Sequence, residues 1–65
     1  SNARQIAMYV VRDITQLPMA SIGEEFGGRD HSTVVYATQQ VEKNMVKDPR
    51  TKATIEDIIK NIRDR

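Results

Sequence analysis

Two adjacent glycines, Gly27 and Gly28, separate two helical patterns and constrain the fold more than any other feature of the sequence. Glycine readily adopts positive φ just beyond a helix end, so the pair predicts that one helix stops there and a tight turn follows. Asp30 comes next, and its side-chain oxygen is suited to cap the free N–H groups of a new helix. The segment is therefore predicted to form a helix, a turn and a second helix, as in a helix-turn-helix motif.

Apolar residues recur at spacings of three and four along the chain, which is the period of amphipathic helices, and the predicted fold class is all-α. Four helices are expected: about residues 4–16, 19–26 and 30–46, and a last helix after the Asp48–Pro49 boundary. The residues predicted to face inward are Ile6, Val10, Ile14 and Leu17, then Val34, Thr38, Val41 and Met45, and finally Ile55, Ile58, Ile59 and Ile62.

Gly23 lies inside the predicted second helix, where glycine costs about 1 kcal/mol relative to alanine. A residue that disfavours the helix is expected to serve another purpose. We predict that another helix crosses closely at this position.

Composition excludes several kinds of site. The 65 residues make one small domain, with no cysteine and a single histidine, so no disulfide, catalytic thiolate or structural zinc is expected. No run of apolar residues reaches the length of a membrane span and no signal peptide is recognisable, so the chain is predicted to be cytoplasmic. Residues 1–3 look like an expression-tag remnant and are left out of the predicted domain.

The net charge of +1 does not by itself favour nucleic acid as a partner, because DNA binders usually carry a basic patch. Arg29, beside the glycine turn, is suited to contact phosphate, and it is equally suited to pair with Glu24 or Glu25. Composition alone therefore does not lead to DNA.

Asp30, His31 and Ser32 contain the residue types of a hydrolase triad, but adjacent helical residues point about 100° apart and cannot relay a proton along one line. The glycine pair is not followed by the Gly-Lys-Ser/Thr of a phosphate-binding loop. No catalytic or metal-binding residue is therefore predicted, and the chain is not expected to be an enzyme.

The first turn of the third helix has one interpretation in DNA readout and another in ordinary structure. Asp30 can accept a hydrogen bond from cytosine or cap the helix, and His31 can contact a base or remain a solvated surface group. Ser32 and Thr33 can reach bases or phosphates, or reflect common first-turn preferences. From these residues alone, both interpretations stay open.

The run Gly27–Val34 (GGRDHSTV) resembles the signature of the C-terminal DNA-binding domain of the bacterial DnaA replication initiators. The resemblance extends to Arg4–Tyr9 and to Ser21–Gly28, and it is close over residues 4–38. It implies a four-helix, Trp-repressor-like domain with a helix-turn-helix, formed by residues 4–65. The family's domain also has an upstream helix and a basic loop, so this chain resembles a partial domain.

The resemblance also implies roles for individual residues. The implied contacts to bases are Asp30, His31, Ser32, Thr33, Met19 and Ala20, and those to phosphates are Arg4, Gln5, Arg12 and Gln40, with Arg29 added because of its charge. Met19-Ala20 stands where relatives often have Leu-Pro, and Gln40 stands where a basic residue can occur. Without the basic loop, whose arginine enters the minor groove, affinity is expected to be lower.

The predicted function is sequence-specific binding of double-stranded origin DNA, at the repeats called DnaA boxes, within a replication initiator of the bacterial nucleoid. The implied partners are the other domains of the initiator and regulatory proteins, and apolar surface left open by the missing helix is expected to favour self-association. No cofactor is expected here, since ATP would bind to a separate ATPase domain. The alternatives are a helical protein–protein interaction module and a transcription regulator.

Overall fold

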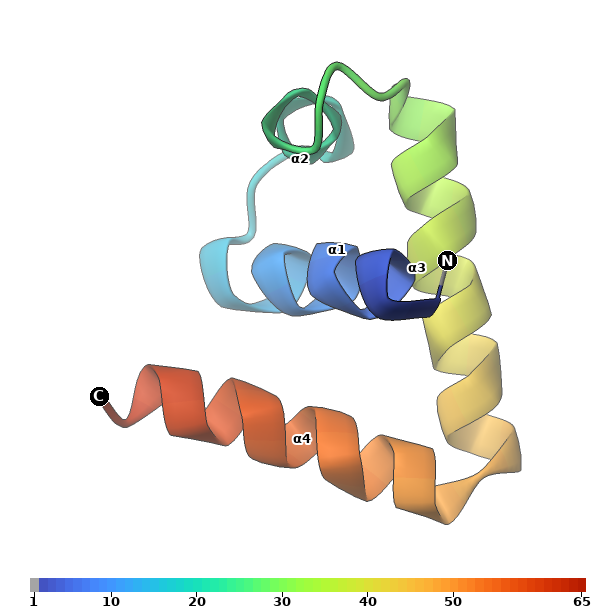
Figure 1. The fold of residues 1–65 in the computed structure, drawn as a ribbon, viewed down its shortest axis with the longest axis vertical. Helices are drawn as coiled ribbons and strands as arrows, with labels where there is room; N and C mark the ends of the chain where they lie inside the picture. Colours follow the sequence, from blue (N-terminus) through green and yellow to red (C-terminus); the bar gives the residue numbers. More distant parts are fainter. Residues whose placement is uncertain (1) are drawn as a thin grey trace.

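The computed structural model describes residues 2–65, which form four helices and, within that range, no strand. The helices are α1 (Asn2–Thr15), α2 (Met19–Glu25), α3 (His31–Lys47) and α4 (Pro49–Arg63). Figure 1 shows α1, α2 and α4 side by side along the long helix α3, with α1 between the other two. The all-α prediction is confirmed, and α2 and α3 form the predicted helix-turn-helix. Within residues 2–65, no helix is long and apolar enough to cross a membrane.

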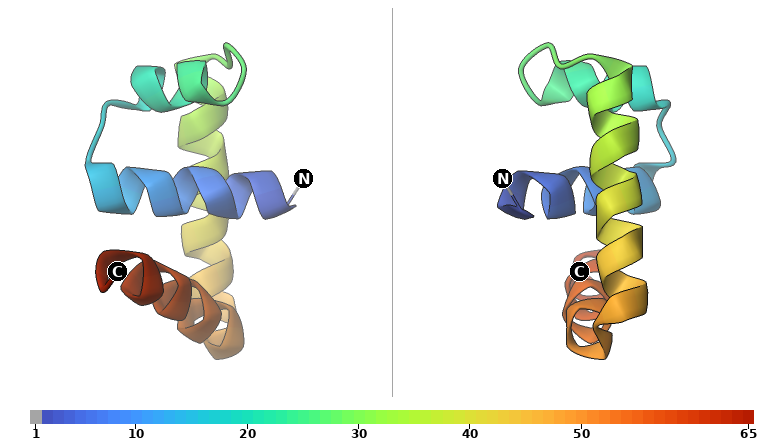
Figure 2. Two further views of the ribbon diagram at one scale, coloured as in Figure 1. Left: turned by 60° about the vertical axis from the view of Figure 1, so that its left-hand side comes forward. Right: turned by 90° about the vertical axis from the view of Figure 1, so that its right-hand side faces the viewer.

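The core consists of two clusters that meet at α1, which crosses α3 near its middle (Figure 2). We call the first the helix-turn-helix cluster; its buried members are Met8, Ile22, Val34 and Ala37. We call the second the α4 cluster; its buried members are Val10, Val41 and Ile55. Met8 and Val10 are two residues apart and point to nearly opposite sides of α1, because each residue turns the helix by about 100°. A single helix therefore supports both clusters.

Three residues predicted to face inward are instead substantially exposed: Ile58 by 38%, Ile62 by 45% and Leu17 by 40%. Within residues 2–65, α4 packs on one side only, and that contact is made by Ile55 and the partly buried Ile59. The predicted stripe of four isoleucines is wider than this contact. Leu17 lies beyond the end of α1, where the chain turns towards α2.

The predicted helix boundaries are correct to within two residues, and the differences have local causes. Asn2 and Ala3 extend α1 beyond its predicted start, and Asp30 precedes α3 as its N-cap residue. Asp48 caps α4 as predicted, since its Oδ1 accepts a hydrogen bond from the Arg50 N–H at 3.0 Å. The Thr51 hydroxyl donates to Oδ2 of the same carboxylate at 3.1 Å, which fixes the bend between α3 and α4.

Candidate nucleic-acid interface

The turn between α2 and α3 depends on its two glycines, as the sequence predicted. Gly27 has φ of 87° and Gly28 has φ of 75°, values that residues with a side chain rarely adopt. Their N–H groups both donate to the carbonyl of Glu24, at 3.2 and 3.3 Å, and so satisfy the end of α2. The turn thus ends α2 and redirects the chain into α3.

Gly23 allows this turn to fold back against α2. The Arg29 N–H donates to the Gly23 carbonyl at 2.8 Å, and a Cβ atom at Gly23 would overlap the carbonyl oxygen of Arg29. The same Cβ would lie 3.5 Å from Cγ2 of Val34 in α3. The predicted close approach is therefore real, but the nearest group is the backbone of the turn, and the crossing helix is second.

Asp30 occupies the N-cap position of α3, but the prediction that its side chain caps the helix is wrong. Its carboxylate makes no capping bond to the helix backbone. Instead, Oδ2 accepts a hydrogen bond from the Ser32 hydroxyl at 3.1 Å. Oδ1 lies 3.7 Å from Nδ1 of His31. The carboxylate thus connects the side chains of the first turn to one another, and leaves the leading N–H groups of α3 without a side-chain partner.

These three residues do not have the geometry of a catalytic triad. The Ser32 hydroxyl donates to the carboxylate of Asp30 and not to His31, so no imidazole is placed to accept its proton. All three side chains are exposed, whereas a triad carboxylate is buried. Within residues 2–65, no group of three or more potential metal ligands is present.

All four residues of this turn, 30–33, are exposed to solvent, and the turn lies at the end of α3 away from α4 (Figure 1). Short polar side chains and free N–H groups at the start of a helix are suited to contact base edges and phosphates. The structure therefore presents Asp30, His31, Ser32 and Thr33 as one polar surface, as the sequence predicted.

The start of α2 contributes less surface than expected. Met19 is half-buried and packs against the helix-turn-helix cluster, whereas Ala20 is exposed. Pro18 precedes the helix at its N-cap position. Of the two base contacts predicted on α2, only Ala20 is exposed to solvent.

The predicted phosphate contacts are distributed over the molecule. Arg4 and Arg12 are eight residues apart on α1, about 12 Å along the helix axis. Arg12 is half-buried and lines a shallow hollow together with Met19, near the start of α2. Arg29 is exposed in the turn and, within the described chain, forms no ion pair with Glu24 or Glu25.

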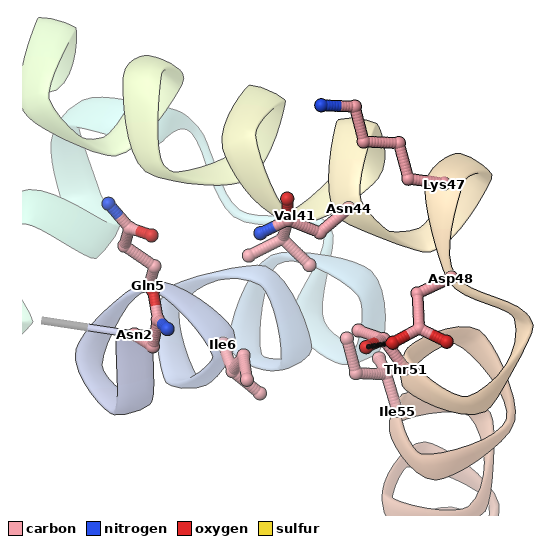
Figure 3. A pocket seen from close by; sticks show the side chains of 9 residues that line it. All are labelled: Asn2, Gln5, Ile6, Val41, Asn44, Lys47, Asp48, Thr51 and Ile55. Carbon is pink, nitrogen blue, oxygen red and sulfur yellow. Dashed lines mark hydrogen bonds between the residues drawn. The ribbon is translucent and has the colours of Figure 1, made fainter.

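Gln5 lies at a different place from the other predicted contacts. It lines a pocket of about 320 Å³ between α1, the C-terminal half of α3 and the start of α4 (Figure 3), whose residues also include Ile6, Asn44 and Thr51. Gln40, the last predicted phosphate contact, is half-buried on α3. The structure thus groups residues 30–33 closely, and of the phosphate candidates only Arg29 lies directly beside them.

One exposed residue on α3 was not predicted as part of the interface. Tyr36 is 58% exposed and lies four residues after Ser32, hence on the same side of the helix. The sequence signal was present, since the spacing from Ser32 is that of one helical turn.

Comparison with known proteins agrees with this architecture. The model of the family described as "Bacterial dnaA protein helix-turn-helix" matches residues 1–41, which contain α1, α2, the glycine turn and the first part of α3. The chain is 50% identical over 62 residues to the "Chromosomal replication initiator protein DnaA" of Thermodesulfovibrio yellowstonii. That alignment covers 95% of this chain and 14% of the relative. No solved structure gives a significant match. The chain belongs to the bacterial DnaA helix-turn-helix family.

Proposed function

We propose that this domain binds double-stranded DNA in a sequence-specific manner, at the repeats of a bacterial replication origin. The observation that supports this proposal best is the polar surface of residues 30–33, which projects from a turn held by Gly23, Gly27 and Gly28. In a helix-turn-helix protein, the N-terminal residues of the second helix contact base edges in the major groove. Family membership supports the same role.

In this proposal, the first turn of α3 reads the bases while cationic and polar groups around it hold the phosphates. Arg29 borders the reading surface directly, and Arg12 reaches the edge of α2 beside Met19. Phosphate contacts supply most of the affinity of DNA-binding proteins and make it dependent on salt. Arg4, Gln5 and Gln40 remain predicted phosphate contacts.

The role of the whole initiator is part of the same proposal. The chain spans 14% of the length of the curated relative. In this proposal, the other domains, the regulatory partners and an ATP-binding domain belong to the whole initiator. We propose that this domain positions the initiator on origin DNA in the nucleoid, and that it needs no cofactor for this step.

The test is fluorescence anisotropy with a labelled DnaA-box duplex and a scrambled duplex, each at low and moderate salt. We expect the chain to prefer the box, and His31→Ala to lower affinity for the box about tenfold, the cost of one lost base contact. Asn61→Ala, at an exposed site near the end of α4, serves as the matched control and should bind like the wild type. Binding to neither duplex by a folded chain would refute the proposal.

A second candidate function, docking of another protein, is favoured by one observation. Ile58 and Ile62 are exposed one helical turn apart on α4 and form an apolar strip. Such docking, or self-association, would be insensitive to salt, whereas DNA binding weakens steeply as salt rises. Sedimentation of the wild type and of Ile58→Ser/Ile62→Ser tests self-association through the strip, and the double variant should bind DNA like the wild type because the strip lies on α4. Unrelated operator duplexes test the transcription-regulator alternative in the same anisotropy assay.

A further inference from the structure

Tyr36 is exposed at a position where a large aromatic side chain contributes little to the core. It is 58% exposed, whereas its neighbours Val34 and Ala37 are buried in the helix-turn-helix cluster. One side of α3 therefore packs against α1 and α2, whereas Tyr36 lies on a side that is exposed to solvent. Its side chain is available to a partner.

The position of Tyr36 relative to the reading surface defines what it can reach. Ser32, Tyr36 and Gln40 are spaced by four residues, so they form a row along one side of α3. Each step of four residues rises about 6 Å along the helix axis. The major groove is about 8.5 Å deep. With α3 entering the groove N-terminus first and Ser32 near the base edges, Tyr36 would lie at the height of the groove wall, and Gln40, about 12 Å from Ser32 along the helix, would lie beyond it.

The chemistry of tyrosine fits the sugar–phosphate backbone that forms this wall. A phenolic hydroxyl donates readily to phosphate oxygens, and the ring can cover the adjoining sugar. Ser32 and Thr33, one turn earlier, face the same side of α3 and carry no negative charge that would repel a phosphate.

The other tyrosine of the chain has the opposite surroundings. Tyr9 is half-buried on α1, and both its burial and the nearby carboxylates of Asp13, Glu42 and Glu56 raise its pKa. Tyr9 therefore provides a control of the same residue type on another helix, away from the row of Ser32, Tyr36 and Gln40 on α3.

We propose that Tyr36 is a phosphate-contacting residue of the interface, whose hydroxyl donates a hydrogen bond to the DNA backbone at the edge of the major groove. This inference rests on the proposed DNA-binding function. It predicts a distinctive signature, because the contact is neutral and independent of base sequence. Removing the hydroxyl should weaken binding to every duplex by the same factor and leave the salt dependence unchanged.

The experiment compares wild type, Tyr36→Phe, Tyr36→Ala and the control Tyr9→Phe, using box and scrambled duplexes at several salt concentrations. Tyr36→Phe is expected to lower affinity about 3- to 10-fold on both duplexes, the net effect of one solvent-accessible hydrogen bond, with an unchanged slope against salt. Tyr36→Ala should lose at least as much. Tyr9→Phe should stay within twofold of wild type, and circular dichroism should show the same helix content in all four proteins.

Wild-type affinity in Tyr36→Phe, with the box preference intact, would overturn this inference and leave the proposed function standing. A loss confined to the box duplex would also overturn it, since Tyr36 would then read a base. If the wild type binds neither duplex, the proposed function fails first, and the inference fails with it.

Discussion

Beside the helix-turn-helix cluster, the backbone of the turn lies directly against α2 at Gly23, whereas the α4 cluster joins its helices through the buried side chains of Val10, Val41 and Ile55. The first arrangement depends on Gly23, against which the Arg29 carbonyl packs, and on a hydrogen bond between the two residues. The second depends on Ile55, the one buried residue of α4, supported by Ile59.

This difference corresponds to a difference in purpose. A surface that reads DNA must hold its contacting groups in a fixed geometry, and a backbone-to-backbone contact leaves little freedom of movement. α4 needs only to cover one side of α1 and the C-terminal half of α3, and the isoleucines Ile55 and Ile59 are enough for that. We therefore expect the two clusters to respond differently to mutation.

Truncation of the buried isoleucines should give the largest effects. Ile22→Ala and Ile55→Ala each remove a fully buried side chain and are expected to cost about 3 kcal/mol of unfolding free energy. Native-state hydrogen exchange should show that Ile22→Ala exposes amides throughout the domain, while Ile55→Ala exposes mainly those of α4. Equal exposure of α4 and α2 in both variants would show that the clusters unfold as one unit.

The glycines of the interface should give the next largest effects. Gly23→Ala introduces a Cβ that overlaps the Arg29 carbonyl and is expected to cost about 2 kcal/mol, even though alanine favours the helix. Gly28→Ala is the matched control: its Cβ would meet no atom within 4 Å, so only the strain of a positive φ remains, about 1 kcal/mol.

Thermal unfolding measures this pair, and the fall in Tm should be about twice as large for Gly23→Ala as for Gly28→Ala. Gly23→Ala should also weaken DNA binding more than its loss of stability explains, because Arg29 must move. Equal effects in the two variants would contradict the importance of the close backbone contact.

The two N-cap aspartates should differ by a smaller amount. Asp48→Ala removes the hydrogen bond to the Arg50 N–H and should cost about 1 kcal/mol in chemical denaturation. Asp30→Ala removes no capping bond and should cost no more than about 0.5 kcal/mol, from the lost interaction with the helix dipole. A cost of about 1 kcal/mol for Asp30→Ala would mean that its carboxylate caps α3 in solution.

The ion pair between α1 and α4 should give the smallest effect. Arg63 Nη2 lies 3.4 Å from Asp13 Oδ2, and because the pair is largely exposed, its coupling energy should not exceed about 0.5 kcal/mol. A double-mutant cycle of Asp13→Asn and Arg63→Gln, at low and high salt, measures the coupling. A larger, salt-resistant value would show that α4 is held by more than Ile55.

The residues that were predicted correctly depend on local chemistry. The glycine turn, the Asp48 cap and the helix boundaries follow from the conformational preferences of a few neighbouring residues. Residues 30–33 were expected to be exposed because they begin a helix after a turn. The Asp30 cap was predicted wrongly: its carboxylate accepts from the Ser32 hydroxyl and makes no bond to the helix backbone, and residue type alone does not reveal that side-chain orientation.

Tyr36, Ile58 and Ile62 show the opposite case. Aromatic and aliphatic side chains at helical spacing usually face a core. Ile58 and Ile62 were therefore predicted to be buried, and Tyr36 was not predicted to belong to the interface. Whether they are buried depends on which helix lies opposite, and helical periodicity contains no information about that partner.

The sequence by itself determined the number of helices, the position of the turn and the family, because these depend on neighbours along the chain and on a contiguous run of residues. Only the tertiary structure decided that α1 separates two clusters, that α4 is covered on one side and that Arg29 packs against Gly23. Those features arise from contacts between residues distant in the chain. Their strength depends on shape and packing, which no local preference encodes.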